Sequence, residues 1–145
     1  MPKKDPVQFH FLVPVTLLNR RGLKAYIASV FKKKKRTLGD LNIIFCNDQY
    51  LLELNRRFLN HDYYTDILSF PLSQNHQPLI AEIYISVDRV SENAQASGSS
   101  FKEELHRVIF HGVLHFCGYK DKLKKEIKAM RLAEDKHLAN YFNSF

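Results

Sequence analysis

The sequence predicts a single-domain α/β (α+β) protein in which a small mixed four-stranded sheet is covered by about five helices. The 145 residues are 45% hydrophobic, which is enough for one ordinary core. Short runs of branched and aromatic residues alternate with longer segments of helical periodicity, in the order β-α-β-α-β-β-α-α-α. Neither a repeat nor a low-complexity linker interrupts the sequence, so we expect residues 1–145 to form one domain.

The first part of the chain predicts two strands, each followed by a helix. The apolar run from Val7 to Val13 favours a first strand. Apolar residues then recur at helical spacing over residues 15–35, and a basic run closes this segment. Leu41 to Cys46 is a candidate for a buried strand, and Asp48 is a suitable cap for the helix expected after it.

The second part predicts a hairpin and then three helices. Residues 63–72 favour a strand ending at Pro71, and Leu79 to Val87 favour another, so the two can pair across a polar loop. Gly98 is expected to end the first of the helices, and Ser100 to cap the second. The three helices are predicted over residues 86–97, 101–117 and 122–142.

Charge and cysteine usage narrow the class of protein. A net charge of +7 and a pI near 9.4 favour a polyanionic partner, with nucleic acid ahead of an anionic membrane surface. Since neither a membrane-spanning run nor a secretory segment is visible, we expect a cytoplasmic protein. Cys46 and Cys117 lie in apolar surroundings, which is typical of buried reduced thiols, although Cys117 could also contribute to a metal site.

One predicted helix carries the chemically most specific pattern. His111 and His115 lie one helical turn apart, on the line that also includes Glu104. Gly118 favours a left-handed helix end, after which Asp121 can turn back toward the histidines. Two imidazoles and a carboxylate can occupy three corners of a tetrahedral metal site and leave the fourth for water. Without a metal, the same histidines would be ordinary hydrogen-bonded residues of the core or surface.

Three ordered stretches of this sequence, HGVLHFCGYKD, LNRRFLNHDYYTDILSFPL and AEIYIS, together resemble the YbeY family of bacterial metal-dependent endoribonucleases. The run HGVLHFCGYKD is similar to that family's His-Gly-x-Leu-His-x-x-Gly-Tyr-Asp-His signature. LNRRFLNHDYYTDILSFPL resembles its Leu-Asn…Thr-Asp-x-Leu-Ser-Phe-Pro block, and AEIYIS resembles its Gly-Glu/Asp-Ile-x-Ile-Ser strand. The resemblance spans residues 41–122 and implies an α/β fold built on a small sheet.

The resemblance also implies an activity and a cofactor. It implies a single-strand-type endoribonuclease of ribosomal RNA maturation and ribosome quality control, in which a metal-activated water attacks the phosphodiester. The implied partners are ribosomal RNA and the ribosome or its small-subunit proteins. The implied ligands of one divalent ion are His111, His115 and Asp121, which stands where the family has a third histidine. Zinc is the preferred ion, with manganese or nickel as alternatives. The carboxylate of Asp121 shifts the preference toward harder ions such as manganese.

Two other expected catalytic groups are harder to assign. The family's basic residue falls on Leu59, so a cation there must come from Arg56, Arg57 or another segment. Arg57 is the preferred candidate, although both arginines could equally lie on a solvated helix face. A zinc peptidase would carry a glutamate directly after the first histidine, where this chain has Gly112. Candidates for a general base, each also able to serve as a structural hydrogen-bond partner, are Glu104, Asp66 and Glu82.

Two basic clusters are candidates for guiding RNA. The first is Lys32 to Arg36, which could instead simply stabilise the end of a helix. The second is the group of lysines at positions 120, 122, 124, 125 and 128. Two other functions stay open: a non-catalytic ribosome-assembly or RNA-binding factor with a structural metal, and an iron oxygenase with two histidines and one carboxylate.

Overall fold

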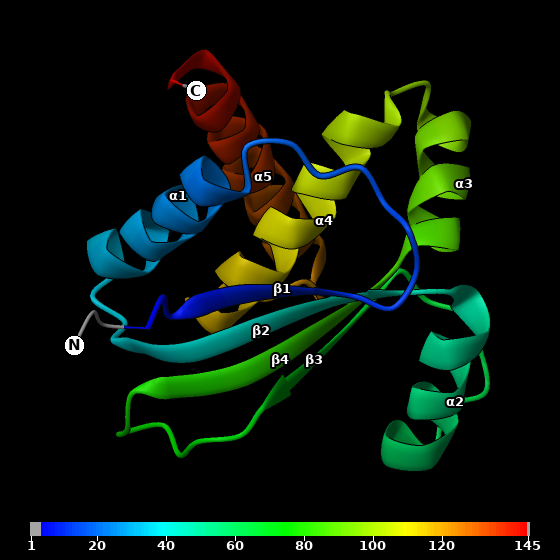
Figure 1. Ribbon diagram of the computed structural model, residues 1–145, viewed down its shortest axis with the longest axis horizontal. Coiled ribbons are helices and arrows are strands. Elements are labelled where there is room, and N and C mark those ends of the chain that lie inside the picture. Colours follow the sequence, from blue (N-terminus) through cyan, green and yellow to red (C-terminus); the bar gives the residue numbers. More distant parts are fainter. Residues whose placement is uncertain (1–3, 145) are drawn as a thin grey trace.

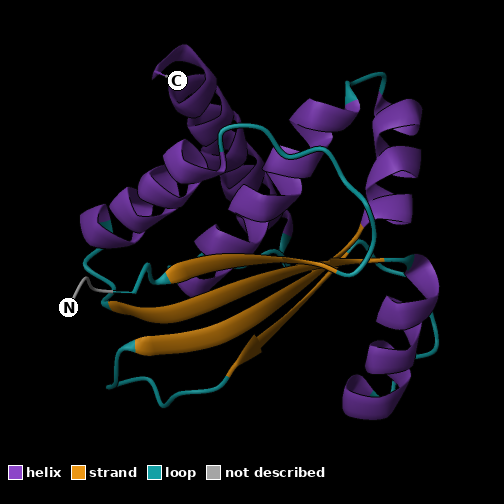
Figure 2. Ribbon diagram, in the orientation of Figure 1, coloured by secondary structure: helices purple, strands orange, loops and turns teal. Residues whose placement is uncertain are grey.

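A four-stranded mixed sheet lies at the centre of the computed structural model, which describes residues 4–144 (Figures 1 and 2). Its strands are β1 (Val7–Phe11), β2 (Leu38–Cys46), β3 (Ile67–Pro71) and β4 (Leu79–Ser86). They lie in the order β1-β2-β4-β3, with β1, β2 and β4 parallel and β3 antiparallel to β4. The predicted mixed sheet and its hairpin are confirmed.

Five helices surround this sheet within residues 4–144. They are α1 (Arg20–Lys33), α2 (Asp48–Leu59), α3 (Val87–Ser97), α4 (Phe101–Phe116) and α5 (Lys124–Ser144). In Figure 2, α1, α4 and α5 lie on one side of the sheet, whereas α2 lies on the other. The predicted fold class and order of elements are therefore confirmed. None of these helices is both long and apolar enough to cross a membrane.

The main core lies between the sheet and α4. Alternate residues of a strand point to opposite faces of the sheet, so one set from each strand faces α4. Ile83 and Ile85 of β4 are fully buried on the face toward α4. Gly112 in α4 allows the helix to come close to this face. A Cβ at Gly112 would lie 2.9 Å from the Cδ1 atoms of both Ile67 and Ile83. Side chains of the sheet thus occupy the space that a larger residue at position 112 would need.

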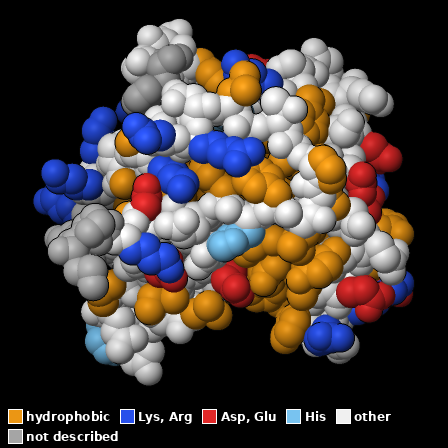
Figure 3. Space-filling view, viewed as in Figure 1, with side chains coloured by type: hydrophobic (Ala, Val, Ile, Leu, Met, Phe, Trp, Pro, Cys, Tyr) orange, Lys and Arg blue, Asp and Glu red, His pale blue; other side chains and the backbone are white. Residues whose placement is uncertain are grey.

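A smaller core lies under α2 on the opposite face. It contains Cys46, Leu51 and Leu68, with Phe70 and Tyr84 packed against it. Figure 3 shows a broad group of hydrophobic side chains exposed on this side, between the sheet and α2. The sheet is therefore covered by several helices on the α4 side and only partly covered on the α2 side.

The predicted boundary of α1 was wrong at its start. The helix begins at Arg20, and the side chain of Asn19 caps it by accepting a hydrogen bond from the Gly22 backbone N–H at 3.2 Å. A Cβ at Gly22 would lie 2.7 Å from Asn19 Oδ1 and would displace this cap. Gly22 therefore permits the cap of α1.

Asp48 does not cap α2, contrary to the prediction. The preceding Asn47 does so, since its side chain accepts from the Tyr50 backbone N–H at 2.8 Å. The Asp48 carboxylate instead accepts a hydrogen bond from Ser86 Oγ at 2.6 Å and pairs with Arg89 Nη2 at 2.6 Å. This tertiary pairing with α3 is invisible in the local sequence.

Neither cysteine forms a disulfide. Cys46 is buried, as predicted, and burial raises the pKa of its thiol to about 12. Cys117 is partly exposed rather than buried, and burial of its sulfur still raises its pKa to about 11. Both thiols are protonated at neutral pH and poor nucleophiles.

His106 gives the fold a testable dependence on pH. Its ring stacks on Tyr141, with centroids 5.6 Å apart, and meets the edge of Phe142 at 4.9 Å. Burial lowers the pKa of His106 below its ordinary value, so the folded state favours the neutral ring. As the pH falls below about 6.5, His106 takes up a proton in the unfolded chain more readily than in the folded one. The stability that the neutral ring contributes is therefore lost at low pH.

We expect wild-type protein to lose free energy of unfolding relative to His106→Phe as the pH falls from about 7.5 to about 5.5. One titrating group can contribute at most about 1.4 kcal/mol per pH unit. The variant retains an aromatic ring and removes this titration. Urea denaturation across this range measures the difference, and a difference independent of pH would contradict the account.

Candidate functional site

A cleft of about 500 Å³ opens between α4, α5 and the start of β3. It brings together most of the residues that the sequence singled out. Those that line it are Asp66, Glu104, His111, His115 and Asp121. The mixture of imidazoles and carboxylates in one cleft is typical of a site for a metal ion or for proton transfer.

The two histidines of α4 are held by different partners at their Nδ1 atoms. His111 Nδ1 lies 2.7 Å from Oε2 of Glu134, and His115 Nδ1 lies 2.9 Å from the Tyr119 carbonyl oxygen. Because both partners accept hydrogen bonds, each neutral ring carries its proton on Nδ1. The Nε2 lone pairs are then free to bind a ligand.

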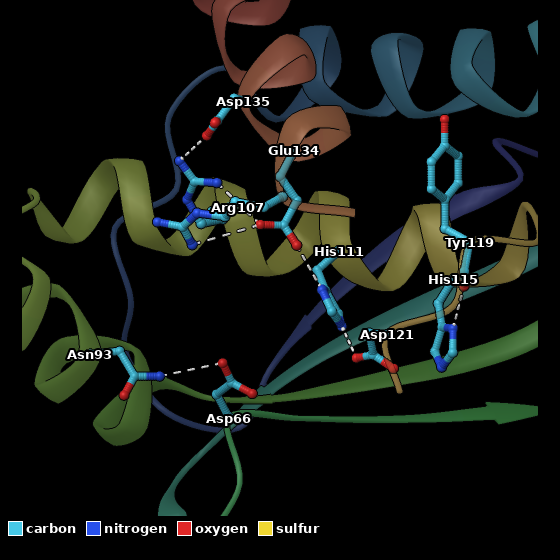
Figure 4. Close-up of polar contacts among 10 residues, drawn as sticks. Asp66, Asn93, Arg107, His111, His115, Tyr119, Asp121, Glu134 and Asp135 are labelled. Atoms are coloured by element: carbon cyan, nitrogen blue, oxygen red, sulfur yellow. Dashed lines mark hydrogen bonds and ion pairs between the residues drawn. The ribbon is translucent and has the colours of Figure 1, made fainter. Parts of the chain in front are cut away.

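The end of α4 positions both Tyr119 and Asp121. Gly118 has a φ of 102°, and the Tyr119 backbone N–H donates to the Leu114 carbonyl at 3.1 Å. This left-handed glycine ends the helix as predicted. The chain then returns so that Asp121 Oδ2 lies 3.3 Å from His111 Nε2 (Figure 4). The predicted approach of Asp121 to a histidine is present.

Two of these donors, on His111 and Asp121, have a spacing that fits a divalent metal ion. Two ligand atoms of a tetrahedral zinc ion, each about 2.0–2.2 Å from it, lie about 3.3–3.5 Å apart. His111 Nε2 and Asp121 Oδ2 have this spacing, at 3.3 Å. His115 is more exposed, and its ring centroid lies 6.1 Å from that of His111. Within residues 4–144, three His, Cys, Asp or Glu side chains are nowhere grouped closely enough to form a complete metal site.

A buried ion-pair network holds His111 from behind. Glu134 on α5 is 5% exposed, and its Oε1 lies 3.1 Å from Arg107 Nη1. Arg107 Nη2 also lies 2.7 Å from Asp135 Oδ1, so the guanidinium is shared by two carboxylates (Figure 4). This arrangement fixes the Glu134 carboxylate that orients His111, in the manner of carboxylate partners of metal-binding histidines.

Burial and charge shift the ionisation of the groups in the cleft. Burial alone would lower the pKa of His111, but the hydrogen bond and charge of Glu134 and the charge of Asp121 raise it above its usual value. Burial raises the pKa of Asp66 and of Glu104. These two carboxylates are therefore stronger bases than ordinary ones, which suits groups that accept a proton near neutral pH.

Several residues considered from the sequence lie elsewhere. Arg57 is exposed on α2 and does not line the cleft, and neither does Leu59. Glu82 shares a sheet face with Tyr84, on the side of α2, so it points away from the cleft. Ser86 caps α3 by accepting from the Arg89 backbone N–H. The structure therefore leaves Asp66 and Glu104 as the candidate bases.

Sequence reasoning missed three charged residues of the cleft: Arg107, Arg131 and Glu134. Arg107 precedes His111 by one helical turn, so the helical periodicity that located the histidines could also have located it. Glu134 lies on another helix, and only the packing of α5 against α4 reveals its contact with His111.

Comparisons with known proteins identify a matching family model, similar sequences and a similar solved structure. The family model described as Endoribonuclease YbeY matches residues 17–142. Endoribonuclease YbeY of Cytophaga hutchinsonii is 48% identical over 123 residues, 85% of this chain and 86% of that protein. The protein of the same name from Flavobacterium johnsoniae is 38% identical over 135 residues, 93% and 96% of the two chains. The solution structure of TM1509 from Thermotoga maritima matches with a TM-score of 0.59 and 28% identity, covering 94% of this chain and 91% of that one.

The network around Glu134 predicts different costs for two arginine substitutions. Arg107 and Arg131 both approach Glu134 Oε1, but their side chains are 11% and 59% exposed. Arg107→Gln leaves a buried carboxylate without its main cation and is expected to cost about 3 kcal/mol of unfolding free energy. Arg131→Gln is the matched control and should change stability by less than about 0.5 kcal/mol. Equal effects in urea denaturation would show that burial of the pair does not matter.

Proposed function

The chain belongs to the YbeY endoribonuclease family, and we propose that it is a metal-dependent endoribonuclease that hydrolyses phosphodiester bonds in single-stranded segments of ribosomal RNA. The proposed role is in ribosomal RNA maturation and ribosome quality control. The observation that carries the proposal is the 3.3 Å spacing of His111 Nε2 and Asp121 Oδ2 inside a cleft also lined by arginines. The proposed partners are ribosomal RNA and the ribosome or its small-subunit proteins.

We infer that His111, His115 and Asp121 hold one divalent ion, with zinc preferred and manganese or nickel as alternatives. When bound, such an ion lowers the pKa of a coordinated water and polarises a phosphoryl oxygen. The two histidines contribute neutral Nε2 donors because their Nδ1 atoms are already hydrogen-bonded. Asp121 contributes a negative charge where the family has a neutral imidazole, which favours harder ions.

The cation that stabilises the phosphate is proposed to be Arg131. Its side chain is 59% exposed, lines the cleft, and lies 3.9 Å from Glu134. Arg107 is less available because Glu134 and Asp135 already share its guanidinium. Arg131 therefore takes the place that the sequence suggested for Arg57, and it supplies a positive charge where Leu59 cannot.

Two carboxylates are proposed as proton acceptors for the attacking water. Asp66 lines the cleft, and its carboxylate accepts a long hydrogen bond from Asn93 Nδ2 at 3.4 Å. Glu104 lies on α4 in line with His111 and is also raised in pKa by burial. Either group can remove a proton from water near neutral pH more readily than an ordinary carboxylate.

Removing His111 tests the catalytic proposal. We expect His111→Ala to cleave structured ribosomal RNA about 100-fold or more slowly than wild-type protein, because a metal ligand contributes at least as much as its outer-shell partners. His76→Ala is the control, since His76 lies on the exposed β3–β4 loop outside the cleft. Undiminished cleavage by His111→Ala would exclude the proposed mechanism. If purified wild-type protein cleaves no RNA, but cells that carry His111→Ala fail to mature their ribosomal RNA, a non-catalytic assembly factor is favoured.

Asp121 provides a separate test of the proposed ligand set. Wild-type protein is expected to bind one zinc ion per chain, and Asp121→Asn to bind it about 10- to 100-fold more weakly. Asp121→His introduces the histidine typical of the family and should increase the preference for zinc over manganese. Competition with a chelating dye measures both affinities. Identical affinities in all three proteins would show that Asp121 is not a ligand.

A further inference from the structure

The end of α1 contains a lysine in a conformation that usually belongs to glycine. The Arg36 backbone N–H donates to the Phe31 carbonyl at 3.0 Å, and the Lys35 N–H donates to the Lys32 carbonyl at 3.1 Å. These two hydrogen bonds form a Schellman motif, whose left-handed position is occupied by Lys35 with a φ of 57°. A side chain with a Cβ is strained at this position, whereas glycine is not.

Other left-handed positions in the described chain follow the usual preference. α3 ends at Gly98 and α4 turns at Gly118, while Asn19 and Asn60 occupy the remaining ones. Glycine and asparagine are the residues that adopt this conformation most readily. Lys35 is therefore the exception among residues 4–144. A strained residue that is not needed for the turn indicates that its side chain has another role.

The side chain of Lys35 borders a basic groove between the end of α1 and the start of β2. This groove has a volume of about 420 Å³, and its cations are Lys32, Lys35 and Arg36. Partly exposed Leu38 contributes apolar surface to it, whereas Phe31, which also borders the groove, is only 1% exposed. The residues lining the groove include no carboxylate. Figure 3 shows Lys and Arg side chains gathered on the side of the molecule where α1 ends.

These cations lack an acidic partner among residues 4–144. Across residues 4–144, the ion pairs do not include Lys32, Lys35 or Arg36. Arg36 makes only a hydrogen bond, from Nη1 to the Gln77 carbonyl at 3.0 Å. The helix dipole favours cations in the last turn, where Lys32 and Lys33 already lie. It gives no reason to accept backbone strain at Lys35.

We propose that this groove binds the phosphate backbone of RNA at a site separate from the catalytic cleft. The inference rests on the proposed function for the identity of the polyanion. Three convergent cations match successive phosphates, and the apolar surface can contact a sugar or base. A membrane surface is a poorer match, because buried Phe31 cannot insert into a bilayer.

The groove is linked to the cleft through one tyrosine. Lys34, next to Lys35, donates from Nζ to Tyr119 Oη at 3.1 Å and lies over the Tyr119 ring at 5.0 Å. The carbonyl of Tyr119 accepts the hydrogen bond from His115 Nδ1. The groove and the cleft thus flank the same short segment after α4. An RNA strand held in the groove can continue past Tyr119 toward His115.

Salt-dependent binding of an uncleavable RNA tests this inference. The probe is a fluorescent single-stranded 2′-O-methyl oligonucleotide, and the readout is anisotropy at several salt concentrations. Each lost phosphate contact is expected to lower the slope of log affinity against log salt by about 0.7. We expect this change for Lys32→Gln and for Lys35→Gln. Lys102→Gln, an exposed lysine outside the groove, is the matched control and should leave the slope unchanged.

Lys35→Gly separates an RNA-binding role from a structural one. Glycine relieves the strain at this left-handed position, so the variant should melt at the same temperature as wild-type protein or higher, while binding the RNA several-fold more weakly. Wild-type affinity and salt slope in Lys35→Gly would overturn the inference. The inference would also be overturned if the groove bound an acidic peptide, or phosphatidylserine vesicles, as tightly as it binds the RNA.

The same assay keeps this inference distinct from the proposed catalytic function. His111→Ala should retain the wild-type salt slope, because His111 does not line the groove. If His111→Ala still cleaves RNA while Lys35→Gly weakens binding, the catalytic proposal fails and the groove remains. If Lys35→Gly binds normally while His111→Ala is inactive, the groove fails and the catalytic proposal remains.

Discussion

The hydrogen bond between Glu134 and His111 is the interaction on which the site depends. It joins α5 to α4 and determines that His111 presents Nε2, rather than Nδ1, to the cleft. Because Glu134 is 5% exposed, its charge needs a partner, and Arg107 provides it. Arg107 also pairs with Asp135, so three side chains on two helices position the His111 imidazole. The orientation of the proposed ligand is thus set by buried electrostatics.

The fold was largely predictable because its signals are local. The periodicity of the apolar residues located every strand and helix, and the glycine at position 118 correctly indicated the turn that brings Asp121 back to His111. The ends of elements were less predictable. Asn47 rather than Asp48 caps α2 because Asp48 is engaged by Ser86 and Arg89, which are distant in the sequence.

Only part of the candidate site could be predicted from the sequence, because contacts between residues that are distant in the sequence leave no local pattern. His111, His115 and Asp121 belong to one short motif, so spacing and a family resemblance could identify them. Glu134 and Arg131 lie on α5, and only tertiary packing places them in the cleft. Arg57, chosen from its place beside Leu59, lies on the exposed surface of α2. Proximity to Leu59 in the sequence did not lead to the arginines that line the cleft, which are Arg107 and Arg131.

The coordination sphere of the bound ion tests the central claim most directly. X-ray absorption spectroscopy of the zinc-loaded protein at the zinc edge reports the number and type of its ligands. The account predicts two imidazole nitrogens and two oxygens, one from Asp121 and one from water, at about 2.0–2.2 Å. Loss of one imidazole in His111→Ala should be visible in the same spectrum. A closed sphere of four protein ligands, or a zinc sphere unchanged in His111→Ala, would contradict the account.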